Sequence, residues 1–216
     1  GSALLLWSDI SNINILDNPY ASMDAFFTIS PLMLLIFIPA LGMRSISEEY
    51  NHGTIEPLIT KPITILQIIC IKFLAILTLI LISITPTLLY VLTIYYLGET
   101  PGNLDLAGIS GSYIGLICLS SVFSSISIFA STLSKNQIIA FILGIVISII
   151  FYLGFDLLSK ILIFESINII LQKIGILYHY ETMSKGLLML SDLFYFISLS
   201  TIFIKCSELV VLKQRK

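Results

Sequence analysis

The segment Met43–Pro62, which reads MRSISEEYNHGTIEPLITKP, concentrates charge in a chain where only 11% of residues are charged. The flanking stretches 26–42 and 73–97 contain no Asp, Glu, Lys or Arg. Because charged side chains are costly in hydrocarbon, this segment is predicted to stand in water between two membrane spans. We expect a soluble partner to dock there. Its charged residues, together with its histidine, are Arg44, Glu48, Glu49, His52, Glu56 and Lys61.

The composition is that of an integral membrane protein. Hydrophobic residues make up 57% of the 216 residues and the mean hydropathy is +1.02, whereas soluble domains contain about 45–50% apolar residues. Apolar runs near or above ~18 residues indicate membrane helices rather than a β-barrel, whose strands alternate apolar and polar positions. The net charge of −2 and the lack of a basic face exclude nucleic acid as a partner.

The predicted fold is an all-α polytopic helical bundle, a single transmembrane domain over residues 1–216. We expect 1–7 to be the remnant of a first span, 8–25 an outer loop, 26–43 a span, 44–62 a cytoplasmic segment, 63–97 a span, 98–108 an outer turn, 109–134 a span, 135–137 a cytoplasmic turn, 138–155 a span, 156–192 an outer loop with short interfacial helices, 193–212 a span and 213–216 a cytoplasmic tail. Pro31, Pro39 and Pro86 lie inside spans, where each frees a carbonyl that a neighbouring helix, Ser, Thr or water must bond. Kinked helices within a bundle are therefore expected.

The stretch 109–134 is rich in glycine and serine, unlike the other predicted spans. Small residues let membrane helices approach closely, so this span is predicted to lie at a helix crossing or beside a second copy of the protein. A polar lining for a transported substrate is the alternative. The small residues are Ser110, Gly111, Ser112, Gly115, Ser120, Ser121, Ser124, Ser125, Ser127 and Ser131.

The distribution of Lys and Arg sets the predicted orientation. If 44–62 faces the cytoplasm, most basic residues lie on that side, as the positive-inside rule requires. The exceptions are Lys160, Lys173 and Lys185, which share one outer loop. Lys72, near the start of its span, is expected to extend its ammonium group to the cytoplasmic interface.

The middle of the charged segment predicts a short helix. Gly53 permits a sharp change of chain direction, and Thr54 is placed to cap the N-terminus of a helix that follows it. Ile55, Leu58 and Ile59 then share one face of that helix. A short amphipathic helix of this kind either floats at the membrane interface or inserts its apolar face into a groove of a partner.

Residues 44–63, RSISEEYNHGTIEPLITKPI, resemble the signature of type-2 ABC transporter permeases, in which paired glutamates precede Gly-Thr-Ile/Leu-Glu and a Leu-Leu-Thr-x-Pro tail. NILDNPYA, the GNLD turn with the following GSYIG, IFASTLSKNQIIAFIL and LQKIGILYHYETMSKG are similar to the corresponding stretches of gliding-motility-associated permeases. The resemblance covers nearly the whole chain from Ile13 onward.

This resemblance implies the membrane-spanning, non-catalytic permease subunit of an ABC transporter in the bacterial inner membrane. The family fold has six membrane helices, of which five are expected complete here. ATP and Mg²⁺ would be bound by a separate ATPase subunit, and a second permease copy or a related permease would complete the pathway. An accessory gliding-motility subunit is a further implied partner. The residues implied to contact the ATPase are Gly53, Thr54, Ile55, Glu56, Leu58 and Ile59, while Arg44, Glu48 and Glu49 are expected to brace the preceding helix by charge pairs among themselves or with a partner.

Motifs for catalysis are absent from the sequence. Neither the phosphate-binding pattern GxxxxGK[ST] nor HExxH or GxSxG occurs. Two other function classes stay open: a membrane anchor for motility machinery, and an ion-coupled secondary transporter. The second would need an ionisable residue in mid-membrane, and only Lys205 and Glu208 approach the interior of a predicted span.

The outer loop contains one chemically suggestive cluster, formed by Tyr178, His179, Tyr180 and Glu181. A ligand-binding or gating site is one interpretation. The other is an aromatic anchor at the membrane interface with a hydrogen-bonded histidine.

Overall fold

The computed structural model describes residues 23–51, 64–97, 105–161 and 165–214. All regular elements in these ranges are helical, in the order α2 (Asp24–Gly42), α3 (Ser47–Asn51), α5 (Ile65–Ile84), the 3₁₀ turn η2 (Thr85–Thr87), α6 (Leu88–Leu97), α7 (Leu106–Leu133), α8 (Gln137–Ile149), the π-helical segment η3 (Ile150–Gly154), α9 (Phe155–Ile161), α10 (Glu165–Ile174), α11 (Ile176–Ser184) and α12 (Leu190–Gln214).

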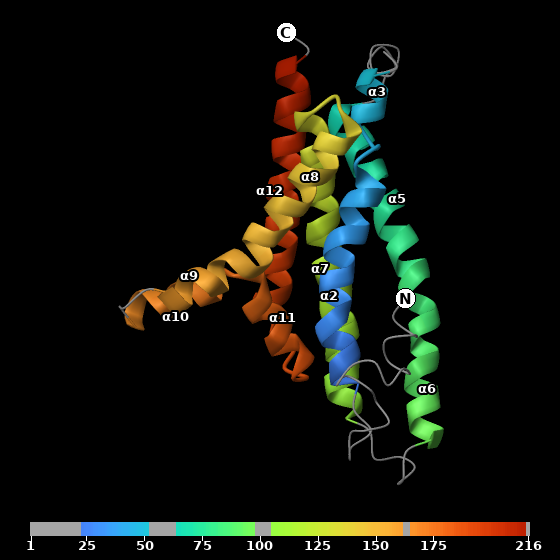
Figure 1. The fold of residues 1–216 in the computed structure, drawn as a ribbon, viewed down its shortest axis with the longest axis vertical. Coiled ribbons are helices and arrows are strands. Elements are labelled where there is room, and N and C mark those ends of the chain that lie inside the picture. The colour runs from blue at the N-terminus through green and yellow to red at the C-terminus, as the bar shows by residue number, and fades with distance from the viewer. Residues whose placement is uncertain (1–22, 52–63, 98–104, 162–164, 215–216) are drawn as a thin grey trace.

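Five described helical stretches are long and apolar enough to cross a membrane, which confirms the predicted all-α polytopic fold. They are Asp24–Asn51, Ile65–Tyr96, Leu106–Leu133, Gln137–Lys160 and Leu190–Lys213. In Figure 1 the long helices run roughly side by side, with α3 and the C-terminus at one end of the bundle. We call this end the α3 end, and the opposite end, where α6 and α11 finish, the α11 end.

Helix α7 is the centre of the bundle. Its most apolar stretch is 72% buried, far more than in the other four spans, and it contacts α2, α5, α8, α11 and α12. The prediction of a helix crossing is therefore confirmed. Among the glycines of α7, the closest approach is at Gly111, where a Cβ atom would lie 2.2 Å from the backbone oxygen of Met183 on α11.

The serine hydroxyls of α7 do not form a polar channel among the described residues. Ser120, Ser124 and Ser125 are fully buried, and each donates to a carbonyl three or four residues earlier in the same helix. Ser127 donates instead to Ile38 of α2, at 3.3 Å. These hydroxyls are thus satisfied inside the protein, which lets small polar side chains sit at tight helix contacts.

Helix α2 continues through both of its prolines. Since Pro31 has no N–H, the carbonyl of Phe27 loses its partner within the helix. The hydroxyl of Tyr180 on α11 donates to that carbonyl at 2.7 Å. A neighbouring helix therefore supplies the missing hydrogen bond, as expected from the sequence. Burial raises the pKa of the Tyr180 phenol, which keeps the hydroxyl protonated and able to donate.

Pro86 interrupts the second long helix. The chain is α-helical from Ile65 to Ile84, tightens to a 3₁₀ turn at Thr85–Thr87 and resumes as α6. Thr64 begins the helix with a capping box, in which its hydroxyl accepts from Gln67 N–H and the Gln67 side chain accepts from Thr64 N–H.

In the part of the predicted outer loop that the structure describes, the chain forms three short helices, α9, α10 and α11. α8 passes through the π segment directly into α9, so the expected span end at residue 155 falls inside a continuous run of helix. Figure 1 shows α9 and α10 leaving the bundle sideways as a hairpin. α11 returns to the bundle and buries Ile176, Tyr180 and Met183, largely against α7.

The Tyr180 hydrogen bond can be tested by Tyr180→Phe, which keeps the ring and leaves the buried Phe27 carbonyl unbonded. We expect the free energy of unfolding in detergent micelles to fall by about 1–3 kcal/mol. Tyr178→Phe, on the 41% exposed ring of the same helix, is the matched control. Equal stability of the two variants would contradict the assignment.

Candidate functional site

The first candidate site is the break between α2 and α3. α2 ends at Gly42, residues 43–46 form a turn, and α3 spans Ser47–Asn51. This break leads directly into the predicted partner-binding segment. Those predicted contact residues, Gly53, Thr54, Ile55, Glu56, Leu58 and Ile59, lie outside the described residues, so their placement stays a prediction.

Ser131 of α7 holds the break in place. Its hydroxyl oxygen accepts hydrogen bonds from the N–H groups of Ile46, at 2.9 Å, and Ser47, at 3.0 Å. The same hydroxyl donates to the carbonyl of Met43 at 3.2 Å. The first turn of a helix has N–H groups with no partner in that helix, so one fully buried serine caps α3 from a neighbouring helix.

Gly42 brings the end of α2 against the same face of α7. A Cβ atom on Gly42 would lie 2.0 Å from the hydroxyl oxygen of Ser127. Any larger residue would push α2 away from α7 and separate Ser131 from the turn that it caps. The small residues of α7 therefore fix the position of the break.

Lys72 of α5 contacts the same turn from the other side. Its ammonium group donates to the backbone carbonyl of Ser45 and lies 2.5 Å from Oε1 of Glu49, with both side chains 23% exposed. The sequence predicted a lysine extended to the interface and charge pairs of Arg44, Glu48 and Glu49 among themselves or with a partner. The structure pairs Glu49 with Lys72, and Arg44 is exposed. The charge pairs expected of Arg44, Glu48 and Glu49 among themselves or with a partner stay a prediction.

The second candidate site is the cluster formed by residues 178–181 of α11. Its side chains contact different parts of the protein. Tyr180 is directed toward α2, as described above. His179 bonds Asp192 of α12 and the Lys173 carbonyl of α10. Tyr178 and Glu181, one turn apart, line a cleft of about 120 Å³ together with Asp156 and Gln172. The four residues therefore do not converge on one ligand.

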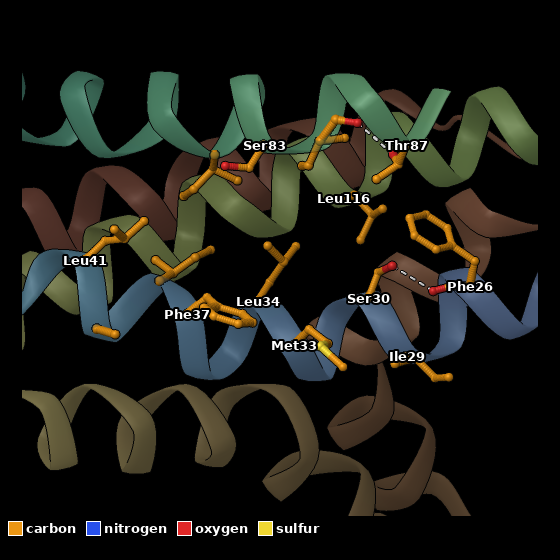
Figure 2. Close-up of a pocket in the computed structure, with 14 residues that line it drawn as sticks. Phe26, Ile29, Ser30, Met33, Leu34, Phe37, Leu41, Ser83, Thr87 and Leu116 are labelled. Atoms are coloured by element: carbon orange, nitrogen blue, oxygen red, sulfur yellow. Dashed lines mark hydrogen bonds between the residues drawn. The ribbon is translucent and has the colours of Figure 1, made fainter. Parts of the chain in front are cut away.

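An apolar groove of about 600 Å³ lies between α2 and α5. Figure 2 shows Leu34 and Phe37 of α2 across from Ser83 and Thr87, with Leu116 of α7 between the two walls. No charged side chain is among the lining residues, and the hydroxyls bond locally: Ser30 to Phe26 O, Ser83 to Leu79 O and Thr87 to Ile84 O.

The groove can hold an apolar chain but has no group for covalent chemistry. Sequence analysis missed it because both walls are apolar on every face, so hydrophobic periodicity does not reveal which faces meet. Among the described residues, no group of three or more His, Cys, Asp or Glu side chains could hold a metal ion.

A comparison with protein families identifies the chain. Residues 8–213 match the model described as ABC-2 family transporter protein. The chain belongs to this family. It is thus a multi-pass membrane protein and a permease of the ABC-2 type. Searches of the curated proteins and of the solved structures found no significant match.

Ser131→Ala should loosen the α2–α3 break in this ABC-2 permease, because it leaves buried backbone groups without their partner. We expect a loss of about 1–3 kcal/mol in the free energy of unfolding. Hydrogen exchange of residues 43–49 should also become faster. Ser125→Ala is the control, since Ser125 is equally buried but bonds only its own helix. Unchanged exchange at 43–49 would show that Ser131 does not hold the break.

Proposed function

We propose that this ABC-2 permease couples ATP hydrolysis by a separate ATPase subunit to movement of a substrate across the membrane. The family match carries the proposal. It is supported by the charged segment Met43–Pro62, whose first residues form the α2–α3 break that Ser131 and Lys72 hold in place. ATP and Mg²⁺ would be bound by the ATPase. The permease would contribute the segment that the ATPase pushes.

The contacts at the break support a mechanical route into the bundle. A displacement of the segment beginning at residue 52 would reach α3 first. From α3 it would pass to α7 through Ser131 and to α5 through the Glu49–Lys72 pair. Because α7 contacts five other helices, its displacement would alter packing throughout the bundle.

The finer assignment rests on the sequence resemblance to gliding-motility-associated permeases of the GldF type. On that basis we propose the bacterial inner membrane as the location, with the α3 end in the cytoplasm. The same resemblance supports a second permease copy or a related permease, and an accessory gliding-motility subunit, as partners. A membrane anchor without transport activity is distinguished by measuring ATP-dependent solute movement in vesicles.

Leu58→Asp tests the proposed ATPase contact. A carboxylate placed in an apolar groove of the partner is strongly unfavourable, so the ATPase should no longer co-purify with the variant. Leu58→Met, which keeps an apolar side chain of similar volume, should retain it. If the aspartate variant still binds at ordinary salt, the segment does not insert into the ATPase.

The Glu49–Lys72 pair can be tested by charge reversal. Glu49→Lys and Lys72→Glu each place like charges together beside the break, so each should reduce stimulation of the ATPase by the permease. The double variant restores an opposite-charge pair and should recover much of the stimulation. Co-purification should persist in all three, which separates loss of transmission from loss of binding. Normal stimulation by both single variants would mean that this pair does not transmit.

A further inference from the structure

His179 is held at both ring nitrogens. Nδ1 lies 2.7 Å from Oδ1 of Asp192 in the first turn of α12. Nε2 lies 2.8 Å from the backbone carbonyl of Lys173, near the end of α10. Side-chain exposure is 11% for His179 and 4% for Asp192, so water has little access to either bond.

The two partners determine how many protons the ring must carry. A carbonyl oxygen only accepts, so Nε2 must donate to Lys173. A second proton must then lie on Nδ1, the more basic of the two partners, so that Nδ1 donates to the Asp192 carboxylate. If this proton were lost, a bare ring nitrogen would face either the carboxylate or the carbonyl, and one of the two contacts would become repulsive.

The surroundings of Asp192 point to the same conclusion. Its second oxygen, Oδ2, is buried and has no hydrogen-bond partner among the described residues. An uncompensated carboxylate in such a place is costly. A pair that retains the second proton is neutral overall, which removes this cost.

The aromatic neighbours of His179 favour the same state. Tyr195 stacks on the imidazole, with ring centroids 4.0 Å apart, a geometry in which a positively charged ring is attracted to the aromatic face. The Tyr195 hydroxyl also donates to the carbonyl of Ile174. Among the side chains that the structure describes, the titratable groups facing the ring are Asp192 and Tyr195 from α12 and Tyr178 from its own helix. α10 contributes a backbone carbonyl, and the Lys173 side chain itself is exposed.

We propose that His179, Asp192 and the Lys173 carbonyl form a buried proton-binding site that clamps α10 to α11 and α12. While the proton is bound, two consecutive carbonyls at the end of α10 are bonded, one by His179 and one by Tyr195. When the proton is lost, the His179 contact is broken and the end of α10 is released. This site operates whether or not the chain couples to an ATPase.

The proton can be observed directly because the chain contains only two histidines. In the full chain with His52→Gln, reconstituted in lipid nanodiscs with ¹⁵N-labelled histidine, His179 supplies the remaining imidazole signal. We expect both ring nitrogens to carry a proton at pH 6. One protonated and one bare ring nitrogen of His179 at pH 6 would overturn the proposal. This test requires no substitution in the proposed site itself.

The clamp is tested by amide hydrogen exchange at residues 172–177, corrected for the intrinsic effect of pH. Raising the pH from 6 to 9 should lower protection in the unmodified chain by about tenfold, as expected when a charge-assisted hydrogen bond is lost. Asp192→Asn should remove the pH dependence, because its amide N–H can donate to an unprotonated Nδ1 while Nε2 still donates to the Lys173 carbonyl. Glu181→Gln removes a carboxylate of α11 that lines the cleft of about 120 Å³ described above. This variant should behave like the unmodified chain. Protection independent of pH in the unmodified chain would refute the clamp.

Discussion

Inside a bilayer, a helix that breaks or bends has no water to bond the backbone groups it exposes, and this constraint governs the arrangement of the whole bundle. Two of the irregularities described above are matched by side chains from other helices. The break after Gly42 meets Ser131 and Lys72. The carbonyl freed by Pro31 meets Tyr180. The contacts that pack these helices together are therefore also the contacts that satisfy their irregular backbone.

The two ends of α7 hold different helices, in both cases through its small residues. At the α3 end its serines hold the start of α3 and the end of α2. Toward the α11 end its glycines let α11 approach so closely that Ser112 reaches the Ser184 carbonyl at 3.4 Å. A helix that contacts so many others through small residues can shift only if its neighbours shift with it. This explains why one central helix is suited to link the two ends of a transporter.

Much of the fold could be predicted from the sequence, because span length and charge placement are local properties. The Gly- and Ser-rich composition of 109–134 also predicted a helix crossing, since small residues have a direct packing consequence. Contacts between distant residues could not be predicted. Lys72 pairs with a residue 23 positions away, and nothing in its neighbourhood indicates that partner. Asp192 was predicted to lie in an outer loop, whereas it lies in the first turn of α12, 2.7 Å from Nδ1 of His179.

The hairpin of α9 and α10 limits how this bundle can be arranged among its neighbours. It projects sideways from one flank, whereas α5 and α6 form the opposite flank (Figure 1). Another protein in the same membrane cannot approach the first flank closely without meeting or displacing the hairpin. The protein is therefore asymmetric about its long axis, with a projecting hairpin on one flank and the long helix pair α5–α6 on the other.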